Sequence, residues 1–92
     1  MNYTMNKHTA TDEVTGQVFT RNSATKIYSH AVVTYFILKD GTVECTSKFA
    51  TWASRLDLAQ KEKAATERYY AKAHLSDEIA RVEVRILEAE VK

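Results

Sequence analysis

The 92-residue chain lacks proline and contains only two glycines and one cysteine. A lone cysteine excludes an internal disulfide and a zinc site made of several cysteines. The two isolated glycines, Gly16 and Gly41, cannot form the glycine-rich loops that cradle phosphates and dinucleotides, or a Gly-x-Ser-x-Gly nucleophile turn. The length predicts one small domain that spans residues 1–92.

The chain also lacks an excess of charge of one sign and a long apolar run. Thirteen basic and 12 acidic residues give a net charge of +1, which argues against a protein that binds nucleic acid. No stretch approaches the roughly 18 apolar residues of a membrane helix, and residues 1–15 contain no apolar segment of signal-peptide type. We therefore expect a protein of the reducing cytoplasm that does not enter a membrane.

Local composition divides the chain near residue 50. β-Branched and aromatic residues dominate before that point, and Ala, Glu, Lys, Arg and Leu dominate after it. The predicted fold class is α+β: a loose arm at residues 1–12, a three-stranded antiparallel β-meander at residues 13–49, and a helical region at residues 54–92. Ser76-Asp77-Glu78 resembles a second helix start, so one long helix and two consecutive helices both remain open.

The strongest strand signal is Lys26–Leu38, whose apolar half has no polar face and therefore favours a central strand. Asp40-Gly41 predicts a hairpin turn after it, because glycine adopts the positive φ that such a turn needs. Residues 42–48 then return as the partner strand. A two-residue loop places Leu38 opposite Val43, and a change of one residue in the loop length would exchange the two faces.

Two tyrosines mark the first predicted helix. Leu58, Ala65 and Tyr69 recur at helical spacing, which predicts an amphipathic helix with Tyr69 on its buried stripe. The adjacent Tyr70 cannot face the same neighbour, and it suits an interface, where tyrosine is enriched.

A second helical segment is predicted from Leu75 onward, because its apolar residues are spaced 4-3-4-3 as in a coiled coil. The strict alternation of residues 82–86 would also fit a strand, but the surrounding Ala, Glu and Leu favour a helix. Apolar residues on two sides of this helix predict a homo-oligomer, most simply a dimer. The predicted interface consists of Leu75, Ile79, Val82, Ile86, Ala89 and Tyr70.

The sequence contains no recognisable constellation for catalysis or metal binding. His8, His30 and His74 fall in three different predicted elements, and none is close in sequence to Cys45. Cys45 lies within a predicted strand, where a buried cysteine behaves as a small apolar residue. We therefore expect no metal, no other cofactor, no catalytic residues, and a protein that is not an enzyme.

A dense polar cluster follows the first predicted strand. If residues 19–21 pair with residues 25–28, its side chains gather at one end of a hairpin. Arginine, lysine and hydroxyl groups can bind phosphate or carboxylate, and tyrosine or histidine can stack on a base, although a solvated polar turn is the simpler alternative. The candidate binding residues are Arg21, Ser23, Lys26, Tyr28 and His30.

Three stretches of the chain, Thr20–Ser23, Tyr28–Val33 and Trp52–Lys61, together resemble a pattern in small hypothetical proteins of bacteriophages. The resemblance extends from Gly16 to Lys61, about half of the chain. It implies a phage or prophage origin and brings no known activity or catalytic residue with it. Small accessory phage proteins commonly act by binding a component of the host.

These observations lead to one functional expectation and two alternatives. The expectation is a non-enzymatic accessory protein in the host cytoplasm that binds, and thereby inhibits, a host protein or a defence complex. The first alternative is an oligomeric sponge that holds a nucleotide signal through the region Arg21–His30. The second is a nucleic-acid-binding protein, against which the small net charge argues.

Overall fold

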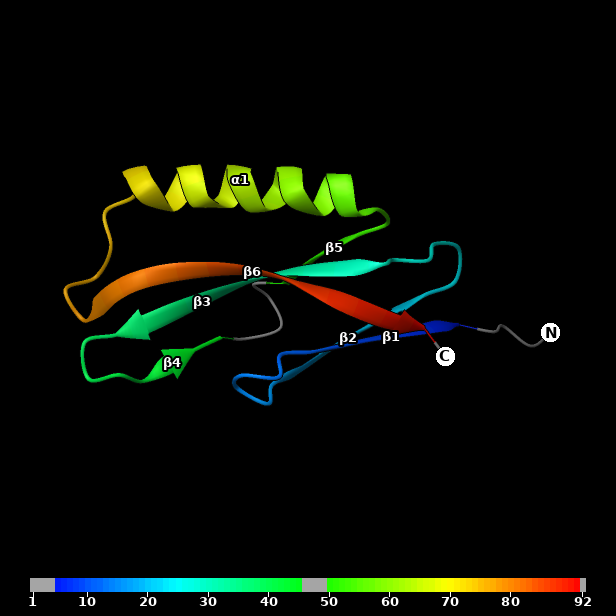
Figure 1. The fold of residues 1–92 in the computed structure, drawn as a ribbon, viewed down its shortest axis with the longest axis horizontal. Coiled ribbons are helices and arrows are strands. Elements are labelled where there is room, and N and C mark those ends of the chain that lie inside the picture. Colours follow the sequence, from blue (N-terminus) through cyan, green and yellow to red (C-terminus); the bar gives the residue numbers. More distant parts are fainter. Residues whose placement is uncertain (1–4, 46–49, 92) are drawn as a thin grey trace.

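The computed structural model describes residues 5–45 and 50–91, which form six strands and one helix in an elongated molecule (Figure 1). In chain order these are β1 (Asn6–Thr11), β2 (Val18–Ser23), β3 (His30–Leu38), β4 (Val43–Glu44), β5 (Ala50–Ala53), α1 (Leu56–Lys72) and β6 (Ile79–Val91).

Strand β3 lies at the centre of one curled antiparallel sheet. β6 pairs with the whole of β3 along one edge, while β5 and β4 pair in succession with its other edge. β6 then runs past the end of β3, and Ala89–Val91 pair with β1, which pairs in turn with β2. The strand order is therefore β2-β1-β6-β3-β4, with β5 also beside β3. The predicted three-stranded meander is wrong, because β6 lies between β1 and β3.

The two faces of the sheet are covered by different elements. The β1–β2 hairpin curls onto one face, here called the hairpin face, and α1 lies across the other, here called the helix face (Figure 1). On the hairpin face, the ring of Phe19 packs edge-on against Tyr35 with the ring centroids 6.5 Å apart. The buried core of the hairpin face consists of Ala10, Phe19, Ala31, Val33, Tyr35 and Ile37. The smaller core of the helix face consists of Val32, Ala53, Ala59 and Val84.

The predicted helix from Leu75 to the C-terminus is wrong, because residues 79–91 form the longest strand. The alternation in residues 82–86 prevails over the heptad spacing because β3 offers β6 a long edge to pair with. This pairing places Val84 and Ile86 under α1 and puts the alternating charged residues Glu83 and Arg85 on the hairpin face. The modest helix preference of the surrounding Ala, Glu and Leu is smaller than the gain from this tertiary pairing.

The loose arm predicted for residues 1–12 is also wrong where the structure describes it. Asn6–Thr11 is β1, and it pairs with β2 on one edge and with the end of β6 on the other. His8 and Ala10 are its two buried side chains. With only two inward residues and one of them polar, the strand has no apolar period that the sequence could show. β2 accordingly pairs with β1, and not with residues 25–28.

The hairpin turn at Asp40-Gly41 is confirmed. Gly41 has a φ of 90°, and the Leu38 N–H donates to the Thr42 carbonyl at 2.8 Å. The predicted register is wrong by one residue, because Ile37 and not Leu38 lies opposite Val43. Val43 therefore shares a face with Ile37, which is the exchange of faces that a longer loop produces. The predicted continuation of this strand through residues 46–48 lies outside the described residues.

Helix α1 covers the sheet through small and polar side chains. Tyr70 is the one large ring among its buried or half-buried positions, which lie on one side of the helix and consist of Ala59, Glu62, Lys63, Thr66, Tyr70 and the adjoining Ala73. The predicted roles of the two tyrosines are reversed, since Tyr69 is 67% exposed and Tyr70 is half-buried. Within the described ranges, no helix has the length and apolarity needed to cross a membrane.

Candidate functional site

A groove runs along the side of α1 that faces β5, and we call it the α1–β5 groove. It consists of two hollows, of about 580 Å³ near the start of the helix and about 360 Å³ towards its end. Thr51 of β5 and Glu62 of α1 line both hollows, which makes them continuous.

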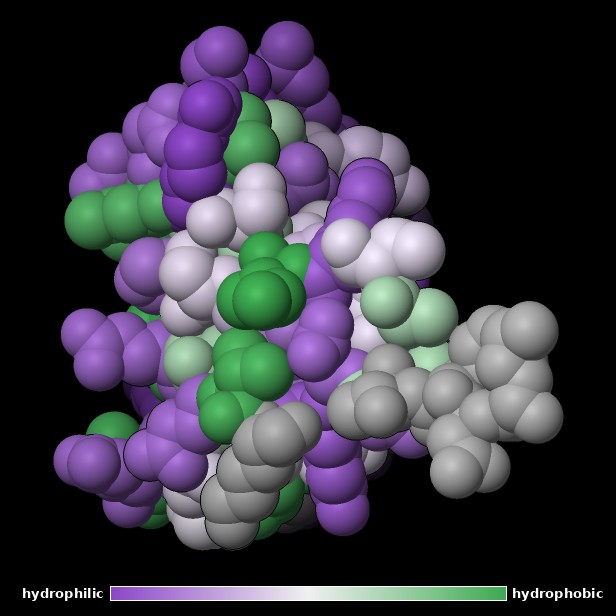
Figure 2. Space-filling view, turned by 90° about the vertical axis from the view of Figure 1, so that its right-hand side faces the viewer, coloured by the Kyte–Doolittle hydropathy of each residue, from purple (hydrophilic) through white to green (hydrophobic). Residues whose placement is uncertain are grey.

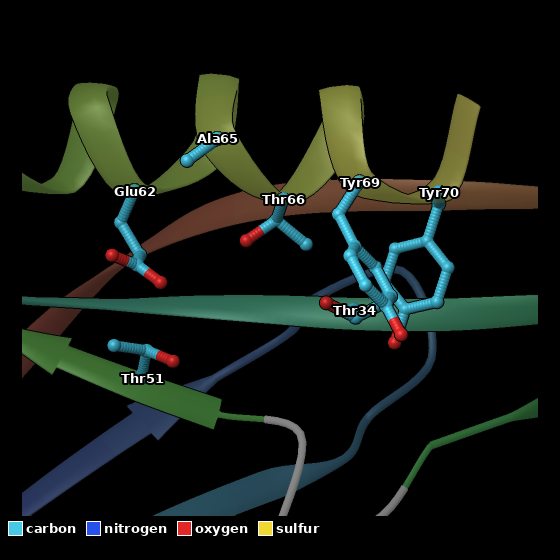
Figure 3. A pocket seen from close by; sticks show the side chains of 7 residues that line it. All are labelled: Thr34, Thr51, Glu62, Ala65, Thr66, Tyr69 and Tyr70. Carbon is cyan, nitrogen blue, oxygen red and sulfur yellow. The ribbon is translucent and has the colours of Figure 1, made fainter. Parts of the chain in front are cut away.

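The helix contributes its most apolar stripe to this groove. Leu58 lines the first hollow, and Ala65 and Tyr69 line the second, at the seven- and four-residue spacings that place them on one side of a helix. Figure 3 shows Ala65, Tyr69 and their neighbours on α1 extending towards Thr34 and Thr51 of the sheet. The stripe lies outside the core because the side of α1 that packs on the sheet carries mainly small and polar side chains, such as Ala59 and Thr66. A stripe that would ordinarily be buried therefore stays accessible.

The two tyrosines make the end of the groove aromatic. Tyr70 is held against the sheet, since its ring packs edge-on against Phe36 of β3 with the ring centroids 5.6 Å apart. Tyr69 packs edge-on against Tyr70 at 5.0 Å and extends over the hollow (Figure 3). One ring is thus anchored and the other is presented to solvent.

The other end of the groove combines apolar and basic side chains. Ile27, which is 63% exposed, and Tyr28 lie on one side, and Lys26 and Lys61 line the same hollow. Trp52 lines it from β5, and its ring lies 6.4 Å from that of Tyr28. Figure 2 looks onto this end of the molecule, where hydrophobic surface occurs as small patches between hydrophilic side chains.

The structure brings together four of the five residues predicted to bind a ligand, as two pairs. The Arg21 guanidinium lies over the Tyr28 ring at 5.2 Å from its centroid. The Ser23 hydroxyl accepts a hydrogen bond from the Lys26 N–H at 3.0 Å. His30 stands apart at the start of β3, where its Nδ1 lies 2.7 Å from the Ser29 hydroxyl. Lys26 and Tyr28 are the two that line the groove.

The buried His8 holds this region in place. Its Nε2 accepts a hydrogen bond from the Tyr28 N–H at 2.9 Å, so its other ring nitrogen, Nδ1, carries the proton and donates to the Arg21 carbonyl at 3.1 Å. The imidazole ring also forms a triangle with the rings of Tyr28 and Trp52, whose centroids lie 5.1 and 6.0 Å from its own. His8 therefore joins the end of β2 to the segment that forms the rim of the groove.

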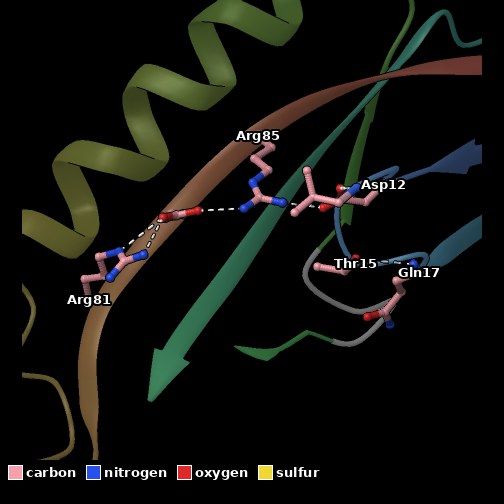
Figure 4. A network of polar contacts seen from close by, with 7 residues as sticks. Asp12, Thr15, Gln17, Arg81 and Arg85 are labelled. Carbon is pink, nitrogen blue, oxygen red and sulfur yellow. Dashed lines mark hydrogen bonds and ion pairs between the residues drawn. The ribbon is translucent and has the colours of Figure 1, made fainter. Parts of the chain in front are cut away.

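A row of side chains with alternating charge runs along β6 on the hairpin face and ends at the turn between β1 and β2 (Figure 4). Arg85 donates to Asp12 at 2.6 Å and to Glu83 at 2.8 Å, and Glu83 also pairs with Arg81 at 3.1 Å. The Asp12 side chain is only 3% exposed and that of Arg85 is 28% exposed, so this pair is the one removed from water. The Arg85 guanidinium also lies over the ring of Tyr35, 4.7 Å from its centroid.

The pKa values of Asp12 and of the neighbouring Tyr35 are displaced in opposite directions. Burial raises the pKa of the Asp12 carboxyl, but the neighbouring Tyr35 hydroxyl, the Val14 N–H and Arg85 together bring it below its ordinary value. Burial and the Asp12 carboxylate raise the pKa of the Tyr35 phenol. The Tyr35 hydroxyl is fully buried and makes no hydrogen bond of good geometry with the described residues. Asp12 and Arg85 stand 73 positions apart, so nothing in the sequence indicates their pairing.

The residues predicted to form an oligomer interface do not make a helical seam. Four of them lie on β6: Ile79, Val82, Ile86 and Ala89. Val82 and Ile86 face α1, whereas Ala89 is of the opposite parity and pairs with β1. A hollow of about 320 Å³ between α1 and β6 is lined in part by Leu75, Tyr70 and Val82.

Among the described residues, no cluster of three or more His, Cys, Asp or Glu is placed to hold a metal ion. The half-buried Cys45 has a pKa raised by burial and by the charge of Asp12, which is the reverse of what a reactive thiolate needs. No family model, curated protein or solved structure matches this chain.

Proposed function

We propose that the protein is a non-enzymatic binding protein whose α1–β5 groove accepts an extended segment of a partner protein. The observation that carries this proposal is the position of the apolar stripe of α1. Leu58, Ala65 and Tyr69 form the stripe that the sequence shows, and the fold places them along an open groove instead of in the core. An exposed apolar stripe with a polar rim is typical of a protein-interaction site.

The lining of the groove indicates what the partner segment contains. Leu58 and Ile27 offer an aliphatic surface at one end, and Tyr69 offers an aromatic one at the other. Lys26 and Lys61 line the first hollow together with the single acid Glu62, which favours a carboxylate near that end. Tyrosine is among the residues that contribute most to the binding free energy at protein interfaces, and Tyr69 is exposed beside the anchored ring of Tyr70. The expected ligand is a segment with spaced apolar side chains and one acidic residue.

The backbone of β5 adds a second element of recognition. Among the described residues, β5 pairs with β3 alone, so no strand covers its other edge. Thr51, Trp52 and Ala53 are consecutive in β5 and all line the first hollow. A partner segment that enters the hollow can therefore form backbone hydrogen bonds with β5, in the manner of a peptide added to a sheet edge.

The resemblance of Gly16–Lys61 to small bacteriophage proteins makes a host protein the expected partner. Inhibition of that protein, or of a defence complex that contains it, is then the expected result of occupying the groove.

Selection from a display library of linear peptides tests this proposal, because it works whichever host protein is the partner. Selected peptides are expected to shift the backbone NMR signals of α1 and β5 and to leave those of the β1–β2 hairpin unchanged. Tyr69→Ala is expected to weaken binding of a selected peptide at least about tenfold, because it removes the exposed aromatic side chain. Arg68→Ala, at the neighbouring exposed position of the same helix, is the matched control and should bind normally. Peptides that bind Tyr69→Ala as tightly as the unchanged protein would contradict the proposal.

One observation favours a second candidate function, a nucleotide sponge. Lys26, Lys61, Tyr28 and Trp52 line a single hollow, so two ammonium groups and two aromatic rings are available to one ligand. A nucleotide bound there would raise the melting temperature increasingly as its free concentration rises. Lys26→Glu combined with Lys61→Glu should abolish that shift, while Tyr69→Ala should not affect it.

A further inference from the structure

One edge of β6 has no partner over most of its length. β3 pairs with the strand from Ile79 to Glu88 on one side, whereas β1 meets the other side only at Ala89–Val91. Among the described residues, no strand pairs with that second edge between Ala80 and Glu88, and we call this stretch the open edge. An open edge of this length is a template for pairing with another strand.

The backbone groups of alternate residues point out of the open edge. The Ala89 N–H donates to the Ser29 carbonyl at 2.8 Å, in register with the β3–β6 ladder. Since hydrogen-bonded pairs alternate along an antiparallel ladder, odd-numbered residues of β6 direct their N–H and C=O groups towards β3. Even-numbered residues direct theirs away from β3, as the pairing of Glu90 with Thr9 of β1 requires. The outward-facing residues of the open edge are Ala80, Val82, Val84, Ile86 and Glu88.

The sequence of the open edge is complementary to itself. If a second copy runs antiparallel with the two-fold axis at Val84, then Glu83 lies opposite the partner's Arg85, and Val82 lies opposite the partner's Ile86. Val84 then faces its own copy in a hydrogen-bonded pair. Opposite charges and apolar pairs directly across a ladder are stabilising, and like charges are destabilising.

Neighbouring registers lose this match. An axis at Glu83 sets two carboxylates against each other, and an axis at Arg85 does the same with two guanidinium groups. An axis at Val82 retains a pair between Arg81 and the partner's Glu83, but it leaves residues 86–88 unpaired. Val84 is the midpoint of Ala80–Glu88, so the register that matches the charges is also the one that uses the whole open edge.

We propose that the open edge of β6 is the interface of a symmetric dimer, in which two copies pair about Val84 and form one continuous sheet. A hollow of about 710 Å³, lined in part by Glu13, Val14 and Glu88, lies where β1 leaves β6 and provides room for the start of the partner strand. Val82 and Ile86 are predicted by the sequence to lie at an oligomer interface formed by helices. In the proposed dimer they lie at an interface formed by strands. β5 is on the opposite edge of β3, so each copy keeps its α1–β5 groove open.

Charge variants at Ala80 test the register. Ala80 and Glu88 are both exposed in the single chain, and the proposed dimer sets each Ala80 opposite the partner's Glu88. Ala80→Lys adds two cross-strand ion pairs per dimer and Ala80→Glu adds two repulsions, so their dimer dissociation constants in sedimentation equilibrium should differ about tenfold or more. Ala80→Glu combined with Glu88→Lys should restore dimerisation. Gln60→Lys and Gln60→Glu place the same charges on the exposed side of α1 and should leave the dissociation constant unchanged.

Hydrogen exchange supplies a measurement that does not depend on side chains. The amides of Val82, Val84 and Ile86 should become protected as the protein concentration rises, while those of Glu83 and Arg85 are protected at every concentration. A protein that remains a monomer with rapidly exchanging outward amides would overturn the proposal. A dimer that is insensitive to the charge at residue 80 would overturn it equally.

Discussion

The hairpin face of the sheet buries aromatic rings and an ion pair, whereas α1 covers the helix face through small and polar side chains. On the hairpin face, Phe19 and Tyr35 are almost completely enclosed, and Asp12 is paired with Arg85 beneath the turn that joins β1 to β2. On the helix face, the largest apolar side chains of α1 remain in contact with solvent.

This difference separates stability from binding within one small domain. Most of the buried aromatic and charged groups lie on the hairpin face, where each loss removes packing or leaves a group unpaired. The stripe of α1 contributes little to the core and is free to contact another molecule. The two faces should therefore respond very differently to substitution.

Among the charged groups of the molecule, the largest effect is expected from Asp12→Asn. This change leaves Arg85 without its buried partner, and because the Arg85 side chain is partly exposed, the unfolding free energy should fall by about 2 to 3 kcal/mol. Glu67→Gln breaks the exposed pair with Lys63 and should change it by no more than about 0.5 kcal/mol. Urea unfolding at neutral pH measures both, and equal losses would contradict the assignment of the pair to the core.

The same carboxylate predicts a loss of stability in acid. The pKa of Asp12 is lower in the folded than in the unfolded protein, so its contribution is present above the ordinary pKa of 3.8 and is lost as the pH falls below it. Unfolding free energies measured from pH 6 down to pH 2 should show a decline that is smaller in Asp12→Asn. An identical decline in both proteins would assign the acid sensitivity to other groups.

A smaller effect is expected from Tyr35→Phe. The buried hydroxyl has no hydrogen bond of good geometry, but it lies beside the Asp12 carboxylate and helps to lower its pKa, so its removal should change stability at neutral pH by no more than about 1 kcal/mol. The pKa of Tyr35 is raised by folding, so its contribution is present below the ordinary value of 10.0 and is lost as the pH rises above it. Tyr35→Phe should reduce that alkaline loss. A destabilisation above about 1 kcal/mol would show that the hydroxyl has a partner.

The sequence contains the local features of the fold but not its long-range pairings. The Asp40-Gly41 turn and the central strand are readable because turn chemistry and an apolar run are local. Residues 82–86 carry both a period of two and a heptad, and only the edge of β3 decides between them. β1 cannot be recognised in the sequence because its inward side chains, His8 and Ala10, are one polar and one small residue.

The candidate site can be predicted only in part for a related reason. Lys26 and Tyr28 are recognisable as a polar and aromatic pair suited to binding. The stripe of Leu58 and Tyr69 is visible, but its spacing cannot show whether a helix buries that stripe or leaves it in a groove. Here the small and polar residues beside the stripe contact the sheet, and that outcome depends on the shape of the sheet surface.

The most direct test of the binding groove is the stability of Leu58→Ala combined with Tyr69→Ala. If the stripe lines a groove, as its 37% and 67% exposure indicates, the unfolding free energy should fall by less than about 1 kcal/mol. Phe19→Ala on the hairpin face, by contrast, should cost about 3 to 5 kcal/mol. A loss of several kcal/mol in the double variant would show that the stripe belongs to the core, and it would contradict the groove as a binding site.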